Sequence, residues 1–145
     1  MHSDMPSNTA RIRVGCLLEI SVDAGYKTAA DVDQLFAQVA TEVAKLNNPR
    51  HVTVVDWRRC SLMEPKAAER LSQHMASKNA HTVRSAALAN ATSPLAVLQF
   101  VRVIREAGLS DRKLFFEAGE MVAWLAEVLT PEERERLWAF VNRLD

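Results

Sequence analysis

The chain has 145 residues, of which 48% are hydrophobic and 25% are charged, and its 18 basic and 18 acidic side chains cancel at neutral pH. This length and composition are typical of one globular domain with enough apolar side chains for a core. The balanced charge argues against nucleic acid as a partner, because phosphate contacts need clustered Lys and Arg. The sequence also lacks an apolar run of the roughly 18 residues that a membrane-spanning helix needs.

The N-terminal residues 1–10, MHSDMPSNTA, are polar and lack the apolar segment of a signal peptide. We expect them to form a disordered leader, and we assign residues 11–145 to one folded domain. The two cysteines, Cys16 and Cys60, do not make a disulfide framework. We expect both thiols to be reduced, and we therefore predict a cytoplasmic location.

The first elements are two short strands, expected over residues 11–14 and 17–22 and joined at Gly15 either as a hairpin or as one bent strand. A helix follows, because Thr28 is a good N-cap and Asp31 completes a short capping box. An Asn-Asn-Pro sequence ends this helix. Its apolar face comprises Val32, Leu35, Phe36, Val39, Val43 and Leu46.

The central stretch of the chain begins with residues 52–57, which are too apolar for an exposed strand and predict a strand buried on both faces. A loop over residues 58–64 follows. Pro65 then opens a helix that extends to about Lys78, because proline is favoured at the first helical position. A strand, a loop and a helix start in this order form the part of an α/β sheet where ligands or partners usually dock.

The second half of the chain continues to alternate between strands and helices. Residues 83–89 and 112–117 predict strands, and a capped helix over residues 94–107 lies between them. Two helices complete the chain, one over about residues 121–128 and one that begins at a capping box over residues 130–133. This order predicts an α/β fold in which helices pack on a mostly parallel central sheet, with an extra C-terminal helix.

Three stretches resemble the STAS domain in its SpoIIAA-like form, the family of the anti-sigma factor antagonists. Residues 52–56 (VTVVD) and 61–64 (SLME) resemble the family's strand, its Asp and the loop before a helix. Residues 85–90 resemble the next strand, and residues 116–125 (FEAGEMVAWL) resemble the closing segment. Together they cover most of residues 11–129. The resemblance implies a single-domain STAS fold and a non-enzymatic module that binds another protein, an unidentified regulator, in bacterial signalling or regulation.

The chain departs from the family at the start of the helix that Pro65 opens. The resemblance places Glu64 at the Asp of the family's Asp-Ser-Ser-Gly motif, Pro65 at the first Ser and Lys66 at the Ser that is phosphorylated. A serine kinase cannot modify lysine, so we expect the usual phosphoserine switch to be missing. Ser61, upstream of this position, is either an unrelated loop serine or a displaced phosphosite.

Catalytic and metal-binding patterns are missing from the sequence, and we expect no enzyme activity, no metal and no other cofactor. No two of the four histidines are spaced at i and i+4, and none has a Cys at zinc spacing. Ser61, His74 and Asp56 could be assembled on paper into a triad, but there is no nucleophile elbow to support them. The four glycines form no phosphate-cradling pattern.

Two surfaces are candidates for binding another protein. The first is the loop after the central strand, because Trp and Arg are enriched among interface residues; alternatively, the Trp packs beneath the helices and the arginines are solvated. The second is the helix from Pro94, whose apolar arc is wider than one sheet face needs. Either the last helix covers this excess or a second copy of the chain does, in a homodimer. The residues predicted for the partner surface are Trp57, Arg58, Arg59, Ser61, Glu64 and Lys66, and those predicted for the dimer surface are Phe100, Val103 and Ala107.

A second class of function stays open, since some related α/β folds bind apolar ligands between sheet and helices. The alternative is therefore a small-molecule or lipid-binding carrier. A carrier needs a cavity lined by apolar side chains, whereas a protein-binding module needs a closed core and an exposed apolar patch.

Overall fold

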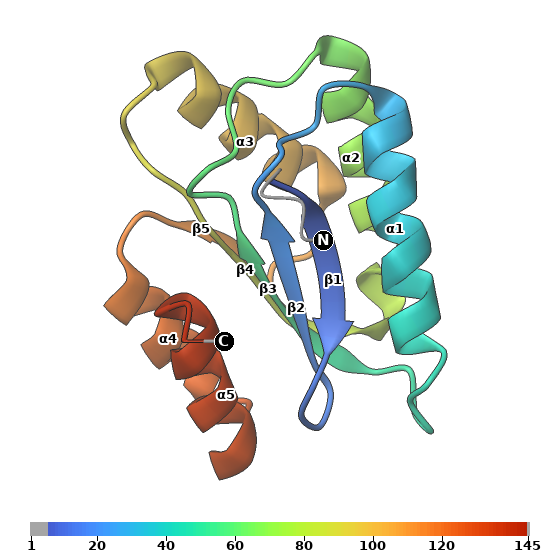
Figure 1. Cartoon of the computed structure of the whole chain (residues 1–145), viewed down its shortest axis with the longest axis vertical. Coiled ribbons are helices and arrows are strands. Elements are labelled where there is room, and N and C mark those ends of the chain that lie inside the picture. Colours follow the sequence, from blue (N-terminus) through green and yellow to red (C-terminus); the bar gives the residue numbers. More distant parts are fainter. Residues whose placement is uncertain (1–5, 145) are drawn as a thin grey trace, which may run out of the picture.

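A five-stranded sheet forms the middle layer of the computed structural model, which describes residues 6–144 (Figure 1). The strands lie side by side in chain order, and only the first pair is antiparallel. Residues 1–5 of the expected leader lie outside the described residues. The strands are β1 (Asn8–Ile12), β2 (Leu17–Val22), β3 (His51–Asp56), β4 (Thr82–Leu88) and β5 (Arg112–Phe115).

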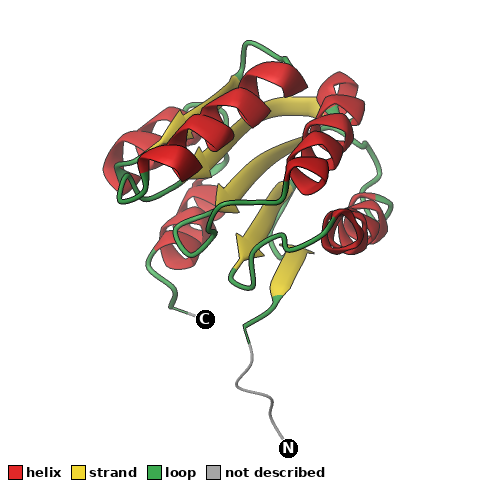
Figure 2. Cartoon of the chain, turned by 90° about the horizontal axis from the view of Figure 1, so that it is seen from above, coloured by secondary structure: helices red, strands yellow, loops and turns green. Residues whose placement is uncertain are grey.

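Helices cover both faces of the sheet (Figures 1 and 2). The first three helices pack on one face and the last two on the other, so the core has two parts. The predicted α/β fold with a mostly parallel sheet and a separate C-terminal helix is confirmed. The helices are α1 (Ala29–Val43), α2 (Pro65–Ser77), α3 (Pro94–Ala107), α4 (Ala118–Ala126) and α5 (Pro131–Val141), with a 3-10 turn, η1 (Asn79–His81), after α2.

The first strand begins earlier in the chain than the polar N-terminal sequence indicates. Residues 8–10, which we expected in the disordered leader, belong to β1. Two contacts explain why polar residues are ordered here. The side chain of Asn8 donates a hydrogen bond of 2.8 Å to the Gly25 carbonyl and accepts one of 3.0 Å from the Ala24 amide, while Ala10 is buried in the core. The leader prediction is therefore wrong for residues 8–10.

Gly15 allows the hairpin between β1 and β2 to approach the last helix. Its φ of +57° lies in the left-handed region that favours glycine. The Glu133 carboxylate packs against it where a β-carbon would stand, and it accepts a 2.8 Å hydrogen bond from the Cys16 amide. Glu133 also completes the predicted capping box with Thr130. One carboxylate thus fixes the start of α5 and joins it to the hairpin.

The central strand β3 is buried along its whole length, as its composition predicts. On one side of the sheet, the ring of Trp57, just after β3, stacks on Phe100 of α3 with ring centroids 4.9 Å apart. On the other side, Val54 packs in the cluster that includes Met121 and Leu125 of α4. The carboxyl end of β3 therefore emerges between the two parts of the core.

Candidate functional site

The loop between β3 and α2, residues 57–64, is held in a fixed conformation at the carboxyl edge of the sheet. The side-chain amide of Gln99, on α3, clamps its backbone: the Met63 amide donates to Gln99 Oε1 at 2.7 Å, and Gln99 Nε2 donates to the Met63 carbonyl at 2.8 Å. Cys60 and Met63 are buried. Because these contacts anchor the loop at several points, the exposed side chains between them have a preorganised backbone.

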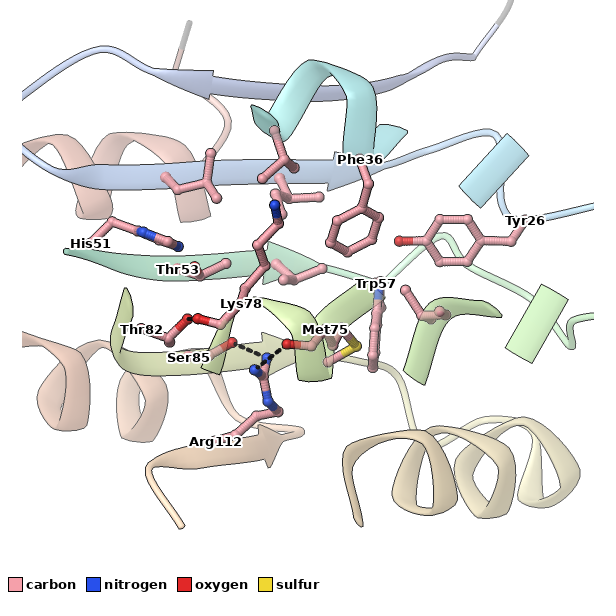
Figure 3. Close-up of a pocket in the computed structure, with 15 residues that line it drawn as sticks. Tyr26, Phe36, His51, Thr53, Trp57, Met75, Lys78, Thr82, Ser85 and Arg112 are labelled. Atoms are coloured by element: carbon pink, nitrogen blue, oxygen red, sulfur yellow. Dashed lines mark hydrogen bonds between the residues drawn. The ribbon is translucent and has the colours of Figure 1, made fainter. Parts of the chain in front are cut away.

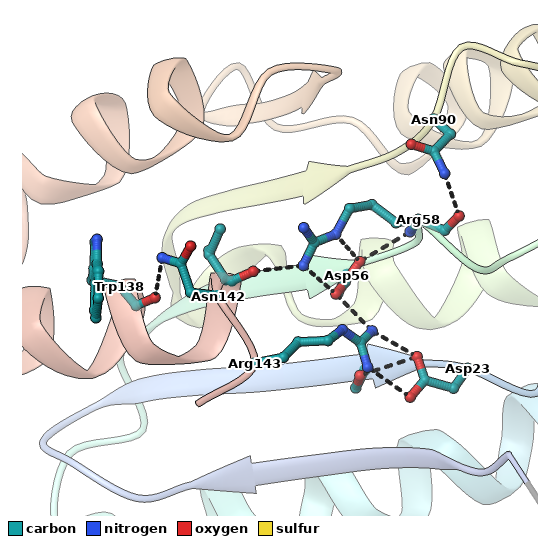
Figure 4. Close-up of polar contacts among 9 residues, drawn as sticks. Asp23, Asp56, Arg58, Asn90, Trp138, Asn142 and Arg143 are labelled. Carbon is teal, nitrogen blue, oxygen red and sulfur yellow. Dashed lines mark hydrogen bonds and ion pairs between the residues drawn. The ribbon is translucent and has the colours of Figure 1, made fainter. Parts of the chain in front are cut away.

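A network of two carboxylates and two guanidinium groups lies beside this loop (Figure 4). Asp56, at the end of β3, is buried and accepts hydrogen bonds from Arg58 at 3.0 and 2.9 Å and from Arg143 at 2.8 Å. Arg143 also binds both carboxylate oxygens of Asp23. Burial alone would raise the pKa of Asp56, but the hydrogen bonds and charge of the arginines outweigh it and lower that pKa.

Arg58 joins three segments that are distant in the sequence. Its guanidinium donates to the Val141 carbonyl at the end of α5 at 2.7 Å, and its own carbonyl accepts a 2.7 Å hydrogen bond from Asn90 after β4. With its bonds to Asp56, this side chain is largely engaged inside the molecule (Figure 4). The geometry gives Arg58 a structural role beside the loop.

The structure separates the remaining residues predicted for the partner surface into two groups. Trp57 is buried against Phe100, so its place on a contact surface was wrong: an indole that directly follows a fully buried strand packs beneath the helices. The others are exposed on the loop and the first turn of α2. They are Arg59, Ser61, Glu64 and Lys66.

Exposed leucines beside these residues were missed by the sequence reasoning. Leu62 in the loop is 54% exposed, and Leu95 and Leu98 on the first turns of α3 are each 66% exposed. The Gln99 clamp brings the start of α3 against the loop, and Leu98 and Gln99 line a groove of about 640 Å³ between α2 and α3. We call Leu62, Leu95 and Leu98 the leucine patch. A signal for it existed, since Leu98 falls outside the apolar arc of its helix.

The dimer surface predicted on α3 is wrong. Phe100, Val103 and Ala107 are 1%, 2% and 2% exposed and belong to the protein's own core. The apolar arc of α3 is wide because this helix packs against α2 as well as the sheet. The last helix is not its cover either, because α5 lies on the opposite face (Figure 1).

Two of the three residues considered for a catalytic triad, His74 and Asp56, are engaged in other contacts. His74 Nε2 lies 2.7 Å from Asp33 Oδ1, in a contact between α2 and α1, whereas Asp56 is bound by arginines. Both cysteines are free thiols, and burial raises the pKa of Cys60 to about 12. Within residues 6–144, no cluster of three or more His, Cys, Asp and Glu side chains is placed to hold a metal ion. Over the same residues, no helix has the length and apolar character to cross a membrane.

A cavity lies between the sheet and helices α1 and α2 (Figure 3). Its volume is about 30 Å³, which admits a water molecule but not an acyl chain. The side chains of Trp57 and Tyr26 line the cavity, and burial raises the pKa of the Tyr26 hydroxyl. The guanidinium of Arg112 also lines the cavity, and burial lowers its pKa to about 10.

Comparisons of the chain with protein-family models, curated proteins and solved structures found no match. The resemblance to the STAS domain therefore stays a prediction from the sequence.

Proposed function

We propose that the chain is a STAS-like, non-enzymatic module that binds a regulatory protein in the bacterial cytoplasm. The contact surface in this proposal comprises the leucine patch and the exposed side chains of Arg59, Ser61, Glu64 and Lys66. The observation that carries it is the exposure of three leucines on a backbone fixed by the Gln99 clamp. Apolar side chains rimmed by charged groups on a rigid backbone are typical of protein-binding surfaces.

The size of the internal cavity favours this function over the carrier alternative. Pockets for small molecules usually enclose some hundreds of cubic ångströms. The cavity between the sheet and helices α1 and α2 has about 30 Å³, and packed side chains such as Phe36, Leu71 and Met75 surround it. A protein-binding module needs a closed core, so the small cavity supports the protein-binding proposal.

The surface works in this proposal without a phosphoserine at the start of α2. The resemblance puts Pro65 and Lys66 at the positions where the family has serines. Glu64 is the N-cap of the helix and makes no side-chain hydrogen bond to it. Ser61 is exposed in the loop, where it contacts the partner as an unmodified serine. Phosphopeptide mapping of the protein purified from its own cells should show no phosphate on residues 61–66. A phosphate on Ser61 in good yield would restore a switch at a shifted position.

The binding proposal is tested by comparing two leucines of similar exposure. Immobilised wild-type protein, Leu62→Asp and Leu144→Asp are incubated with cell extract, and bound proteins are quantified by mass spectrometry. Leu144, near the C-terminus, is 60% exposed and lies outside the leucine patch. We expect a partner that binds the wild type and Leu144→Asp but loses most of its binding to Leu62→Asp, and a purified complex that calorimetry confirms. Equal binding by all three proteins would refute the proposed surface.

A further inference from the structure

The two edges of the sheet differ in their backbone hydrogen bonds. At the β1 edge, side chains of α1 occupy the outward groups. The Ala10 amide donates to Gln38 Oε1 at 3.1 Å, Gln38 Nε2 donates to the Asn8 carbonyl at 3.1 Å, and the Ile12 amide donates to Glu42 Oε1 at 2.9 Å. The carboxamide of Gln38 thus takes the place of a peptide group in a neighbouring strand. This edge is closed to another strand.

The β5 edge has no comparable cover among the residues that the structure describes. The carbonyls of Asp111 and Phe115 accept hydrogen bonds from the β4 side of the sheet, so the alternation along a strand turns residues 112, 114 and 116 outward. The Arg112 amide is bonded locally to the Leu109 carbonyl at 3.2 Å. Within residues 6–144, no hydrogen bond reaches the backbone of Leu114 or Phe116. An unpaired N–H and C=O at Leu114 form a template for a further strand.

Residues 114–116, at the end of this edge, have apolar side chains that are incompletely covered. Leu114 and Phe115 are half-buried, and Phe116 is 46% exposed. The strand ends at Phe115 and the chain bends at Phe116, after which Glu117, the N-cap of α4, has φ −127° and ψ 117°. A run of three apolar residues at the end of an open edge strand is a contact surface that proteins otherwise avoid exposing.

We propose that β5 pairs antiparallel with β5 of a second copy of the chain and joins the two sheets. Leu114 then exchanges backbone hydrogen bonds with Phe116 of the second copy, and Phe115 lies opposite its own equivalent on the two-fold axis. In this register Lys113 lies opposite Glu117 of the second copy, and both side chains are exposed. We assign the binding partner as a second copy of the chain, because Lys113 and Glu117 of two copies meet as opposite charges only when the segments run antiparallel. This pairing does not depend on the proposed partner surface, which lies elsewhere.

The charge pairing gives the first test. Sedimentation of the wild type at up to about 100 µM, where a small interface should be populated, is expected to show a dimer. Lys113→Glu and Glu117→Lys each place like charges opposite one another twice in the dimer, and each should weaken association about tenfold. The double variant restores opposite charges and should recover most of the affinity. Thermal melts check that each variant is folded, because Lys113 also lies 4.9 Å from the Trp124 ring and Glu117 caps α4.

A cysteine scan tests the register. Residues directly opposite in a non-hydrogen-bonded antiparallel pair have α-carbons about 4.5 Å apart, which suits a disulfide. Phe115→Cys should therefore form a covalent dimer on mild oxidation, whereas Leu114→Cys, whose equivalent lies diagonally about 7–8 Å away, should not. The wild type, with its own two thiols, is the blank. A wild type that stays monomeric at about 100 µM, a double variant no better than the single ones, or equal cross-linking of both cysteine variants would overturn the proposal.

Discussion

The strands at the two ends of the sheet differ in how their outer edges are covered. Their sequences alone suggest that β5 is the protected edge and β1 the open one. Strand β5 has adjacent Arg and Lys residues, the usual means of discouraging edge pairing, whereas β1 has Ala10 and Ile12 at its outward positions. Yet β1 is the covered edge, because Gln38 and Glu42 of α1 bind its outward groups. An edge is therefore closed by side chains that reach it from another element, and strand composition alone does not reveal it.

The difference also lies in what anchors each strand, and Arg112 gives the largest expected effect. This buried guanidinium at the start of β5 bonds to neutral oxygens of other elements, including Ser85 Oγ at 3.1 Å and the Met75 carbonyl at 3.1 Å. Arg112→Met leaves these buried acceptors without a donor. We expect a loss of about 3 kcal/mol or more in the free energy of unfolding, measured by urea denaturation. The Arg112→Met protein should also release the β5 edge from the sheet.

The neighbouring residue provides the control for that measurement. Lys113 is exposed and has the same charge, and its removal in Lys113→Met forfeits a cation–π contact with Trp124. The loss should be about 1 kcal/mol or less. Similar losses for the two variants would mean that burial of Arg112 contributes little to holding β5.

Local signals in the sequence predict the elements well, and contacts between distant residues account for what they miss. Helix starts at Thr28, Ser93 and Thr130 are right, because a cap and the amides it binds lie within three residues. The start of β1 is missed, because Asn8 is ordered through bonds to residues 16 and 17 positions away. The polarity of neighbouring residues in the sequence does not indicate such long-range hydrogen bonds.

The candidate site shows the same limit. The loop after β3 lies where the sequence predicts it, because a strand end and a helix start are local signals. Its role as a contact surface stays a prediction. The leucine patch is missed because the Gln99 clamp that places α3 beside Met63 joins residues 36 positions apart. The sequence also does not show what covers the wide apolar arc of α3. Packing against α2 and packing against a second copy of the chain both require apolar residues at the same positions, such as Val103.

Removing the cover from β1 should make the two edges alike. Gln38→Ala deletes both the acceptor for the Ala10 amide and the donor to the Asn8 carbonyl. We expect a loss of about 1–2 kcal/mol in the free energy of unfolding, together with new self-association seen by light scattering, since the freed groups can pair with another chain. Gln34→Ala, an exposed change on the same helix, is the control and should alter neither. If the Gln38→Ala protein is as stable as the control and no more self-associated, the Gln38 side chain does not close the edge.

The smallest expected effect is a pH dependence confined to the β1 edge. Hydrogen bonds from Lys45 and from the Ile12 amide lower the pKa of Glu42 below its ordinary value. A carboxyl with a lowered pKa in the folded state stabilises the fold above the pKa of the unfolded chain, and this contribution is lost as the pH falls through the folded pKa. The Ile12 amide should therefore lose protection from hydrogen exchange, relative to its intrinsic rate, as the pH falls below the ordinary pKa of a glutamate side chain.

The replacement Glu42→Gln separates this effect from general acid unfolding. The side-chain amide oxygen introduced by this replacement can accept from the Ile12 amide at any pH. At neutral pH, Ile12 should be less protected from exchange than in the wild type, because a neutral acceptor binds more weakly, but this protection should not decrease as the pH is lowered. The Leu114 amide, whose outward N–H has no intramolecular acceptor among the described residues, should exchange fast in dilute protein throughout this range. Parallel loss of protection at Ile12 in both proteins would attribute it to unfolding. Constant protection in the wild type would instead show that the Glu42 carboxylate is not what covers this edge, leaving Gln38 as the residue that does.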